Sequence, residues 1–372
     1  MGYRNLLVKW TAGRLADRVR SSATGLLEEP GRRENVKEST LGGLRTTGAL
    51  TALGVIATLV MVSCGSSTGG GSAKPLFVGI NKSADQQYFI DQQQAFKAEI
   101  EKKGGQAKLY NAKLDANTGI SEVNDAISAG AKGIAITVPD QTIGPAVSKA
   151  AADAKVALVA TDDAIKDGSG NPIPFVGFSG TDMGNKVGDE AAKLLNAAGW
   201  VSAGKKVGVL AAEVQTLSVC NDRTTAEKAK ITAGGVPSSS IYSVPYSGET
   251  PSAQTAAGPI ITAHPNVTNW VVFGCNDEGV LGTLNALTTA GAKPDNIIAV
   301  GLGAYEACKP WAANQPTGWK AALFISGKDV GIAAADALWD KVQNNVALPA
   351  STIAKTTIVH PNDYTQYFPC TK

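Results

Sequence analysis

Short apolar runs alternate with amphipathic stretches along most of the chain. The runs Leu76–Ile80 and Val156–Ala160 contain no polar residue, which is typical of strands buried on both faces of a parallel sheet. Between such runs, apolar residues recur at helical spacing, as at Ile120, Val123 and Ile127. Repeated strand–helix units with short loops predict a parallel, doubly wound sheet.

The same alternation starts again in the second half of the chain. A new first strand is expected at Lys206–Leu210, and a last long helix at Lys328–Asn345. We therefore predict an α/β protein made of two doubly wound parallel-sheet lobes joined by hinge strands. A cleft between two such lobes is a favoured site for small ligands.

The segment that follows the last long helix is too short to form a third domain. We expect it to return across the join between the lobes. The expected N-terminal lobe is residues 75–179 plus 326–350, and the expected C-terminal lobe is residues 180–325 plus 351–372. The expected hinge crossings lie near Ser179–Thr181, Ile325–Gly327 and Leu348–Ala354.

The N-terminal segment has the features of an export signal. The apolar stretch Gly48–Val62 follows Arg45, as the core of a signal peptide follows its positively charged end. The stretch is too short to span a membrane comfortably, and a short internal helix is the alternative interpretation. The leader before residue 40 is unusually long, so we expect translation to start downstream, at Val36.

A cysteine motif follows this apolar stretch. Met61–Gly65 resembles the lipobox of bacterial lipoproteins, in which Cys64 is lipidated and becomes the new N-terminus. We therefore expect a signal peptide with lipobox at residues 1–64 and a flexible, Gly/Ser-rich tether at residues 65–74. The protein would then be exported and held by its lipid on the extracytoplasmic face of the cell membrane.

Charge and histidine content exclude several classes of function. Residues 1–63 hold nine of the 34 Lys and Arg and five of the 32 Asp and Glu, so the remainder has a net charge of −2. Such a body has no basic excess to attract nucleic acid. The two histidines, His264 and His360, are far apart, and no cysteine pair has CxxC spacing. We expect no metal site, no cofactor and no histidine-based catalytic triad.

Polar side chains follow several of the expected strands. The acids Asp162 and Asp163 come directly after the run Val156–Ala160, and ligands of open α/β sheets bind at the carboxyl ends of strands. Lys82, Arg223 and Asn276 follow three other expected strands, and Tyr88 adds a flat apolar face. Donors and acceptors together with an apolar surface suit a ligand rich in hydroxyl groups. Taken singly, each residue could instead cap a helix, shape a turn or lie in solvent.

Several segments resemble the periplasmic sugar-binding proteins of ABC importers, pentose/hexose type, and most closely their arabinose-binding members. The matching segments are Gly79–Lys82, Ala129–Gly133, Asp162-Asp163, Arg223–Thr225, Asn269-Trp270, Asn276-Asp277 and Thr317-Gly318. The resemblance extends from Leu76 to about Tyr367 and implies the type I periplasmic binding protein fold. It implies a partner as well, the membrane permease of an ABC transporter, and no enzymatic activity.

The resemblance also implies a ligand-binding set. Lys82, Asp163, Arg223 and Asn276 would bond sugar hydroxyls, with Asp162 as a close second acid and Asp277 beside them. Tyr88 stands where the arabinose-binding members stack a tryptophan, and Phe178 where they place a methionine near the anomeric end.

Two positions depart from the family pattern. Gln86 replaces a ligand glutamate, and Gly303 stands where a ligand asparagine is usual. An unmade buried polar contact costs about 1–3 kcal/mol, so the pocket should not bind arabinose in the family's way. We expect a smaller polyhydroxylated ligand, preferably a tetritol or pentitol, with a pentose as the next choice.

Four cysteines remain besides Cys64, and an exported protein permits disulfides. Four cysteines allow three connectivities. Cys220 and Cys275 both lie at expected strand ends of one lobe, so we hypothesise that they pair and that Cys308 pairs with Cys370 by elimination. Four small buried thiols are the alternative.

Other classes of function fit the sequence less well than a monomeric import protein. Gly301 and Gly303 suggest a dinucleotide loop, but a third glycine is missing and the motif lies late in the chain. Two adjacent acids do not flank a scissile glycosidic bond. A DNA-binding repressor of this fold would need an N-terminal helix-turn-helix, where an export signal is expected. A chemotaxis or sensor receptor of the same fold stays open.

Overall fold

The computed structural model describes residues 73–370. The expected signal peptide at 1–64, the lipidation site Cys64 and most of the tether at 65–74 lie outside the described residues. Within residues 73–370, no helix is both long enough and apolar enough to cross a membrane.

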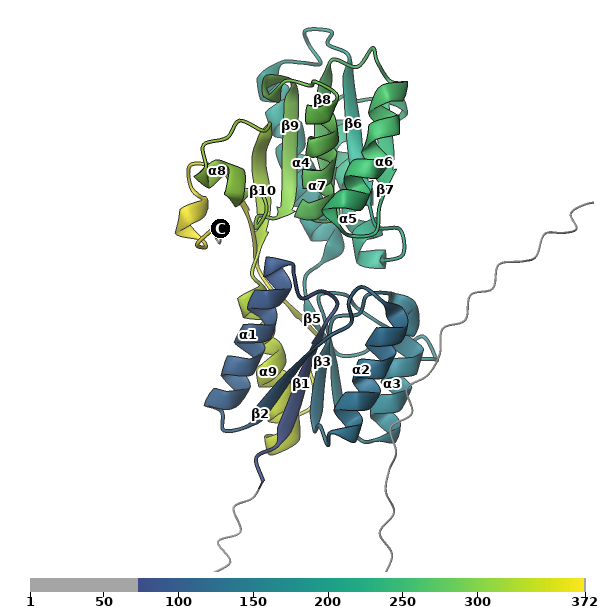
Figure 1. Cartoon of the computed structure of the whole chain (residues 1–372), viewed down its shortest axis with the longest axis vertical. Helices are drawn as coiled ribbons and strands as arrows, with labels where there is room; N and C mark the ends of the chain where they lie inside the picture. The colour runs from purple at the N-terminus through teal and green to yellow at the C-terminus, as the bar shows by residue number, and fades with distance from the viewer. Residues whose placement is uncertain (1–72, 371–372) are drawn as a thin grey trace, which may run out of the picture. The chain divides into compact units, whose positions relative to one another are not determined.

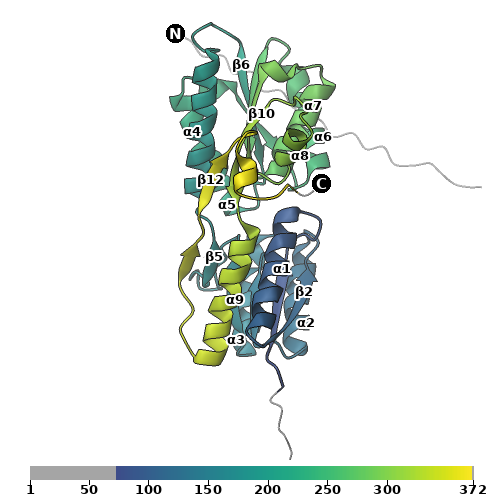
Figure 2. The ribbon, with the colours of Figure 1, turned by 90° about the vertical axis from the view of Figure 1, so that its left-hand side faces the viewer.

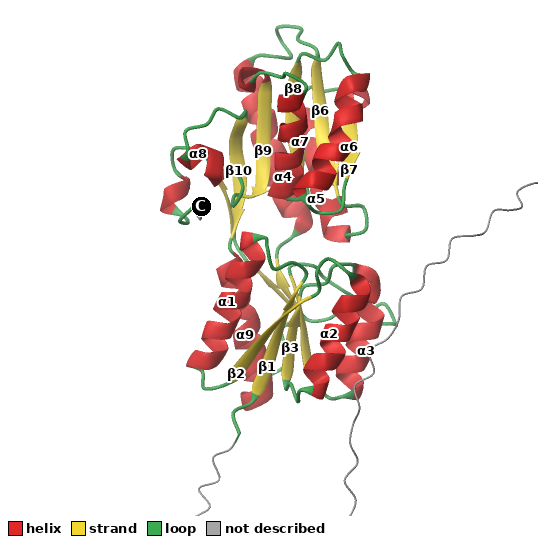
Figure 3. Ribbon diagram, in the orientation of Figure 1, coloured by secondary structure: helices red, strands yellow, loops and turns green. Residues whose placement is uncertain are grey.

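The first sheet is six-stranded and entirely parallel, in the order β11-β5-β4-β3-β1-β2 (Figure 1). Its strands are β1 (Leu76–Asn81), β2 (Gln106–Asn111), β3 (Gly133–Ile136), β4 (Ala157–Thr161), β5 (Phe175–Gly177) and β11 (Ser351–Ile353). Its helices are α1 (Gln87–Lys102), α2 (Ala116–Ser128), α3 (Gly144–Asp153) and α9 (Gly327–Asn344). Helices α1 and α9 cover one face, while α2 and α3 cover the other (Figure 3). We call this unit the N-terminal lobe.

The second sheet is also six-stranded, in the order β12-β10-β9-β8-β6-β7. Its strands are β6 (Val207–Glu213), β7 (Ile241–Pro245), β8 (Asn269–Gly274), β9 (Ile297–Gly303), β10 (Trp319–Ile325) and β12 (Thr356–Val359). Its helices are α4 (Gly180–Ala198), α5 (Ser218–Ala233), α6 (Thr250–Ala263), α7 (Asp277–Thr289) and the short α8 (Cys308–Ala312). Only β12 among these strands is antiparallel to its neighbour. The prediction of two doubly wound lobes is confirmed, and we call this unit the C-terminal lobe.

The chain crosses between the lobes three times, from β5 to α4, from β10 to α9 and from β11 to β12 (Figure 2). The boundary expected after residue 350 was placed too early. Ser351–Ile353 pairs with β5 and completes the N-terminal sheet, so the last crossing falls between β11 and β12. The sequences of β11 and β12 do not show which sheet each strand joins. The choice depends on the strand with which each one pairs, which is β5 for β11 and β10 for β12.

Helix α4 was absent from the predicted elements. Its glycines Gly180, Gly184 and Gly188 lower helix propensity, and they hide the signal of a 19-residue helix. In the fold they form a stripe that lets α5 approach closely. A Cβ on Gly184 would lie 2.2 Å from the Arg223 carbonyl oxygen. The residues that weaken the sequence signal are therefore those that the tertiary packing requires.

Candidate functional site

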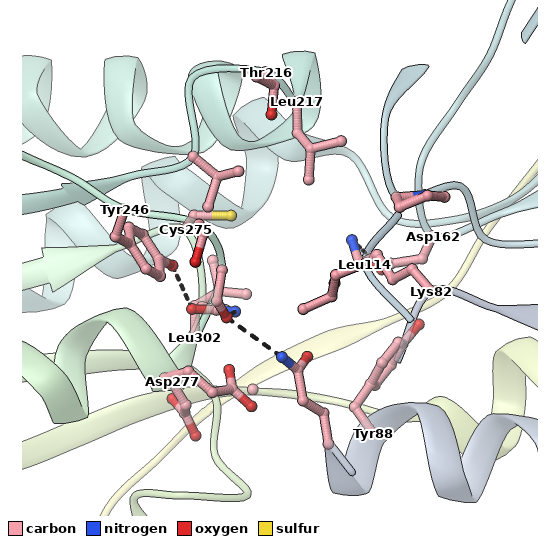
Figure 4. A pocket seen from close by; sticks show the side chains of 18 of the residues that line it. Lys82, Tyr88, Leu114, Asp162, Thr216, Leu217, Tyr246, Cys275, Asp277 and Leu302 are labelled. Carbon is pink, nitrogen blue, oxygen red and sulfur yellow. Dashed lines mark hydrogen bonds and ion pairs between the residues drawn. The ribbon is translucent and has the colours of Figure 1, made fainter. Parts of the chain in front are cut away.

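A cavity of about 480 Å³ lies between the lobes, at the carboxyl ends of strands from both sheets. Its volume is in the usual range for small-molecule sites. Eight of the ten predicted ligand residues line it: Lys82, Gln86, Tyr88, Asp162, Arg223, Asn276, Asp277 and Gly303. Figure 4 shows Lys82, Tyr88 and Asp162 on one side of the cavity, with Tyr246, Cys275 and Asp277 facing them from the other.

Charged side chains from the two lobes meet at one end of the cavity. The Lys82 Nζ donates to Asp163 Oδ2 at 2.5 Å and lies 3.7 Å from Asp162 Oδ2. Asp162 Oδ1 lies 3.9 Å from Arg223 Nη2, which comes from the other lobe. Asp162 has a positive φ of 58°, a left-handed conformation that Asp tolerates better than most residues. This turn at the end of β4 sends two successive carboxylates in different directions.

The two predicted residues that do not line the cavity lie directly behind it. Asp163, expected to bond the ligand, is fully buried beneath Lys82 and holds that lysine instead. Burial raises the pKa of Asp163, and the Lys82 charge acts against this rise. Phe178 packs in the core, with its ring centroid 6.2 Å from that of Tyr88. The prediction that Asp163 and Phe178 contact the ligand is therefore corrected. Both residues lie behind the cavity wall and support residues that line it.

Arg223 is held in place within the C-terminal lobe. It lies on α5, and its Nη1 donates to the Cys275 carbonyl oxygen at 2.8 Å. Cys220, one turn earlier on the same helix, forms a disulfide with Cys275. This is the pairing that was hypothesised, and the second disulfide joins Cys308 to Cys370. The first disulfide ties the helix that carries Arg223 to the strand end that precedes Asn276.

Asn276 uses its side chain mainly within the protein. Its Oδ1 caps α7 by accepting from Gly279 N at 2.9 Å, and it also accepts from the Tyr246 hydroxyl. Its Nδ2 donates to the Gly248 carbonyl oxygen at 3.2 Å. Tyr246, a cavity residue that sequence reasoning missed, is fixed by this bond. Its position after the edge strand β7 carries no motif that could have marked it.

Two neighbouring acids begin α7. Asp277 Oδ2 accepts from the backbone N–H of Glu306 at 3.0 Å, which anchors the loop after β9. Burial raises the pKa of Asp277 to about 7, and the Glu306 charge adds to the rise. Glu278, a second missed residue, also lines the cavity, and burial together with the Asp277 charge raises its pKa to about 8. Gly303, at the end of β9, presents backbone where the family pattern has an asparagine side chain.

Several buried polar atoms around the cavity have no hydrogen-bond partner among the described residues. They include Tyr88 Oη, Asp162 Oδ1, Arg223 Nε and Arg223 Nη2, together with Asp277 Oδ1 and, just behind the cavity, Asp163 Oδ1. Burial is the main cause that raises the pKa of Tyr88 well above its ordinary value, so its hydroxyl stays protonated and can donate. Unpaired buried polar atoms cost free energy. A ligand with both hydroxyl donors and acceptors would satisfy these atoms.

The described residues offer no cluster of three or more His, Cys, Asp or Glu side chains suited to a metal ion. Apolar side chains complete the lining, among them Leu114, Leu217, Leu302 and Tyr305, none of which was predicted. They come from loops and strand ends of both lobes. A single leucine in a loop has no sequence feature that marks it as a cavity residue, because only the folded arrangement of both lobes brings it to the cavity.

Comparison with known proteins gives the family. Residues 77–345 match the family described as periplasmic binding protein domain. The chain belongs to this family. The match covers both lobes, and the resemblance inferred from the sequence is thereby confirmed.

Named relatives of this periplasmic binding protein come from transporters. An ABC transporter L-arabinose-binding periplasmic protein of Azospirillum brasilense is 28% identical over 314 residues, which cover 83% of this chain and 93% of the relative. The L-arabinose-binding periplasmic protein of Escherichia coli (strain K12) is 29% identical over 253 residues, covering 67% of this chain and 76% of the relative.

A solved structure supports the fold. The ABC transporter periplasmic solute-binding protein of Actinobacillus succinogenes 130z with bound D-allose matches with a TM-score of 0.67 and 17% identity. The match covers 79% of this chain and all of that chain. At this identity, the similarity shows the type I periplasmic binding protein fold alone.

Proposed function

We propose that this protein is a lipid-anchored, extracytoplasmic solute-binding protein of a carbohydrate ABC importer. It binds a small polyol (a tetritol or pentitol) or a pentose between its lobes and delivers it to the permease. The observation that carries the proposal is the set of unpaired buried polar atoms on Tyr88, Asp162 and Arg223 around the cavity. Transport relatives that are named for L-arabinose support the sugar-like class of ligand.

The roles of the polar residues follow from their contacts. Lys82, Asp162 and Arg223 contact ligand hydroxyls directly, while Asp163 holds Lys82 in place. Tyr88 offers its hydroxyl and one ring face. The ligand is small because Gln86 and Gly303 do not supply the acid and the amide that the family pattern has at these positions. We propose no catalytic step, no cofactor and no metal.

The remaining parts of the proposal concern location and partners. A lipid on Cys64 holds the protein at the outer face of the membrane, and the Gly/Ser-rich tether at residues 65–74 connects this anchor to the lobes that deliver the ligand to the permease. The protein acts as a monomer and does not bind nucleic acid. Metabolic labelling with a palmitate analogue tests the anchor, because Cys64→Ser should abolish the label and release the protein from the membrane.

A thermal-shift screen tests the ligand class. Tetritols, pentitols, pentoses and hexoses are added separately, and a ligand at 100 times its dissociation constant stabilises the folded state by about 2.7 kcal/mol. We expect stabilisation by one or more tetritols, pentitols or pentoses. Stabilisation by hexopyranoses alone would contradict the small-ligand proposal, and stabilisation by no member of the panel would contradict the proposed function itself.

A further inference from the structure

Two glutamines of the N-terminal lobe bond the backbone of the C-terminal lobe. The Oε1 of Gln141 accepts from Ser218 N at 2.5 Å. The Nε2 of Gln86 donates to the Gly248 carbonyl oxygen at 3.3 Å. Gln86 lines the cavity and Gln141 follows the lining residue Asp140, so both contacts join the lobes beside the proposed ligand site.

Gln141 is oriented by its own lobe. It begins the short 3-10 helix Gln141–Ile143, which Asp140 caps by accepting from Thr142 N at 2.8 Å. Its Nε2 donates to the Ala164 carbonyl oxygen, in the loop that follows the two acids Asp162 and Asp163. With the amide nitrogen engaged at Ala164, the amide oxygen points at the other lobe. Gln141 is therefore preorganised to accept a hydrogen bond across the cleft.

The donor to Gln141 is an N–H that α5 cannot satisfy by itself. The first N–H groups of a helix have no partner within the helix. The residue before α5 is Leu217, whose side chain provides no cap, and Ser218 is the first residue of the helix. Gln141 thus supplies from the opposite lobe the cap that is missing from the chain before α5. Arg223 lies on this helix, about one and a half turns further on.

Gln86 makes a contact that the family's glutamate could not make. An ionised carboxylate only accepts hydrogen bonds, whereas the amide of Gln86 donates one to the Gly248 carbonyl oxygen. Asn276 Nδ2 donates to the same oxygen at 3.2 Å. The glutamine at position 86 therefore allows a hydrogen bond between the lobes, and in this structure its amide nitrogen is used for that bond.

We propose that Gln141 and Gln86 are latches that hold the two lobes closed over the ligand, with Gln141 acting as a helix cap supplied in trans to α5. The proposal rests on the proposed function, because a latch matters only if the cleft closes on a ligand. Both residues are positioning residues, since they act on the lobes and on the Arg223 helix. Their loss should weaken every ligand by the same factor and leave the order of ligand preference unchanged.

Isosteric variants give the two latches opposite signatures. Gln141→Glu keeps an oxygen acceptor for Ser218 N and places a negative charge at the N-terminus of α5, which is favourable for a helix, although it loses the donor to the Ala164 carbonyl oxygen. Gln86→Glu removes the donor and sets a carboxylate against the Gly248 carbonyl oxygen. We expect Gln141→Glu to bind more tightly than Gln141→Ala, because it keeps the acceptor for Ser218 N, and Gln86→Glu to bind at least as weakly as Gln86→Ala.

The test is calorimetric titration with two members of the screen that stabilise the protein. Loss of a helix cap costs about 0.5–2 kcal/mol, so Gln141→Ala should weaken both ligands about fivefold, with their affinity ratio retained. Gln86→Ala should behave in the same way. The matched control is Gln254→Ala, which removes an exposed glutamine of α6 and should leave both affinities unchanged. Unchanged binding in Gln141→Ala, or a changed affinity ratio, would overturn the latch.

A cross-linking measurement separates failure of the latch from failure of the proposed function. The double variant Gln141→Cys, Ser218→Cys is treated with a short bis-maleimide, which can span the length of the replaced glutamine side chain, with and without the best stabilising ligand. We expect a cross-link between the two positions that forms faster when the ligand is present. Absence of this cross-link under both conditions would overturn the latch even if ligands bind. Cross-linking in a protein that no member of the screen stabilises would instead overturn the ligand class and leave the contact between the lobes standing.

Discussion

Lys82 donates to Asp163 at 2.5 Å, while the neighbouring Asp162 faces the cavity and Arg223. Two adjacent acids thus have different surroundings. Asp163 is fully buried, and its Oδ2 accepts from Lys82, whereas Asp162 lines the cavity and its Oδ1 lies 3.9 Å from Arg223 Nη2. The roles of the two acids should therefore separate on mutation.

Asp163→Asn should mainly reduce stability. Breaking a buried ion pair leaves the other charge uncompensated and costs about 3–5 kcal/mol, and the Lys82 side chain is only 12% exposed. We expect a loss of about 3 kcal/mol in the free energy of unfolding, measured by urea denaturation.

Asp162→Asn provides the matched comparison. It should lower ligand affinity about tenfold, equivalent to about 1.4 kcal/mol, with a smaller change in stability, because the carboxylate faces the cavity. Calorimetric titration measures the affinity. An unchanged affinity in Asp162→Asn would remove this residue from the ligand contacts.

The two disulfides close loops of similar length and give a second matched pair. The cysteine separations are 55 for Cys220–Cys275 and 62 for Cys308–Cys370, so loop entropy predicts a similar stabilisation of about 4 kcal/mol from each. Only the first disulfide holds the helix that carries Arg223. The double variant Cys220→Ser, Cys275→Ser should lose both stability and ligand affinity.

The double variant Cys308→Ser, Cys370→Ser should lose stability with affinity retained under conditions in which both variants are folded. Urea denaturation and calorimetric titration measure the two effects. Equal affinity losses in the two double variants would show that the first disulfide has no special effect on the site.

Glu278 should make stability depend on pH. Its pKa in the folded state is raised to about 8 by burial and by Asp277, above the ordinary value of about 4.3. The folded state therefore holds the proton more tightly than the unfolded state. The stabilisation is fully present below about pH 4 and is lost as pH rises towards about 8, with a slope of at most about 1.4 kcal/mol per pH unit.

Glu278→Gln removes this contribution. Urea denaturation between pH 5 and pH 9 should show a stability that falls less steeply with pH than in the parent protein. The control is Glu101→Gln, which removes an exposed acid of α1 on the other lobe and should keep the parent slope. An identical slope in Glu278→Gln would mean that this carboxyl is not perturbed in the folded state.

Two helical glycines should respond differently to alanine. A Cβ on Gly184 would collide with the Arg223 carbonyl oxygen, and overpacking of this kind costs about 1–3 kcal/mol. Gly258 lies within α6, and no atom of another segment lies within 4 Å of the position that a Cβ would take there. Gly258→Ala should therefore change stability much less than Gly184→Ala, because the gain in helix propensity is offset by the contact of the new Cβ with the following Pro259. Urea denaturation measures both. Stabilisation by Gly184→Ala would contradict close packing of α4 on α5.

Most of the fold could be predicted because its signals are local. An apolar run such as Val156–Ala160 indicates a buried strand wherever it lies, and β4 is found within one residue of it. Local signals failed where packing overrides propensity. The glycines of α4 lower its helix propensity, so the helix was not predicted. The strand β11 joins the N-terminal sheet, although the chain around it leads to the C-terminal lobe.

The candidate site could be predicted in part. Strand-end residues such as Lys82, Asp162 and Asn276 were found because parallel strands bring their carboxyl ends to one edge. Asp163 was wrongly predicted to contact the ligand. Two adjacent acids in sequence do not show which of them the turn after the strand directs into the cavity. Gln141 carried no signal, since its partner Ser218 lies 77 residues away in the other lobe.

Local pattern along the chain is enough to specify the order of most strands and helices, the two-lobe class and the chemical character of the cleft, because periodicity and residue type act over a few neighbouring positions. The folded arrangement is needed to specify which acid faces the cavity, which glutamines join the lobes and which sheet each returning strand completes. Those outcomes depend on distances between residues far apart in the chain, and such distances exist only once both sheets have formed and packed.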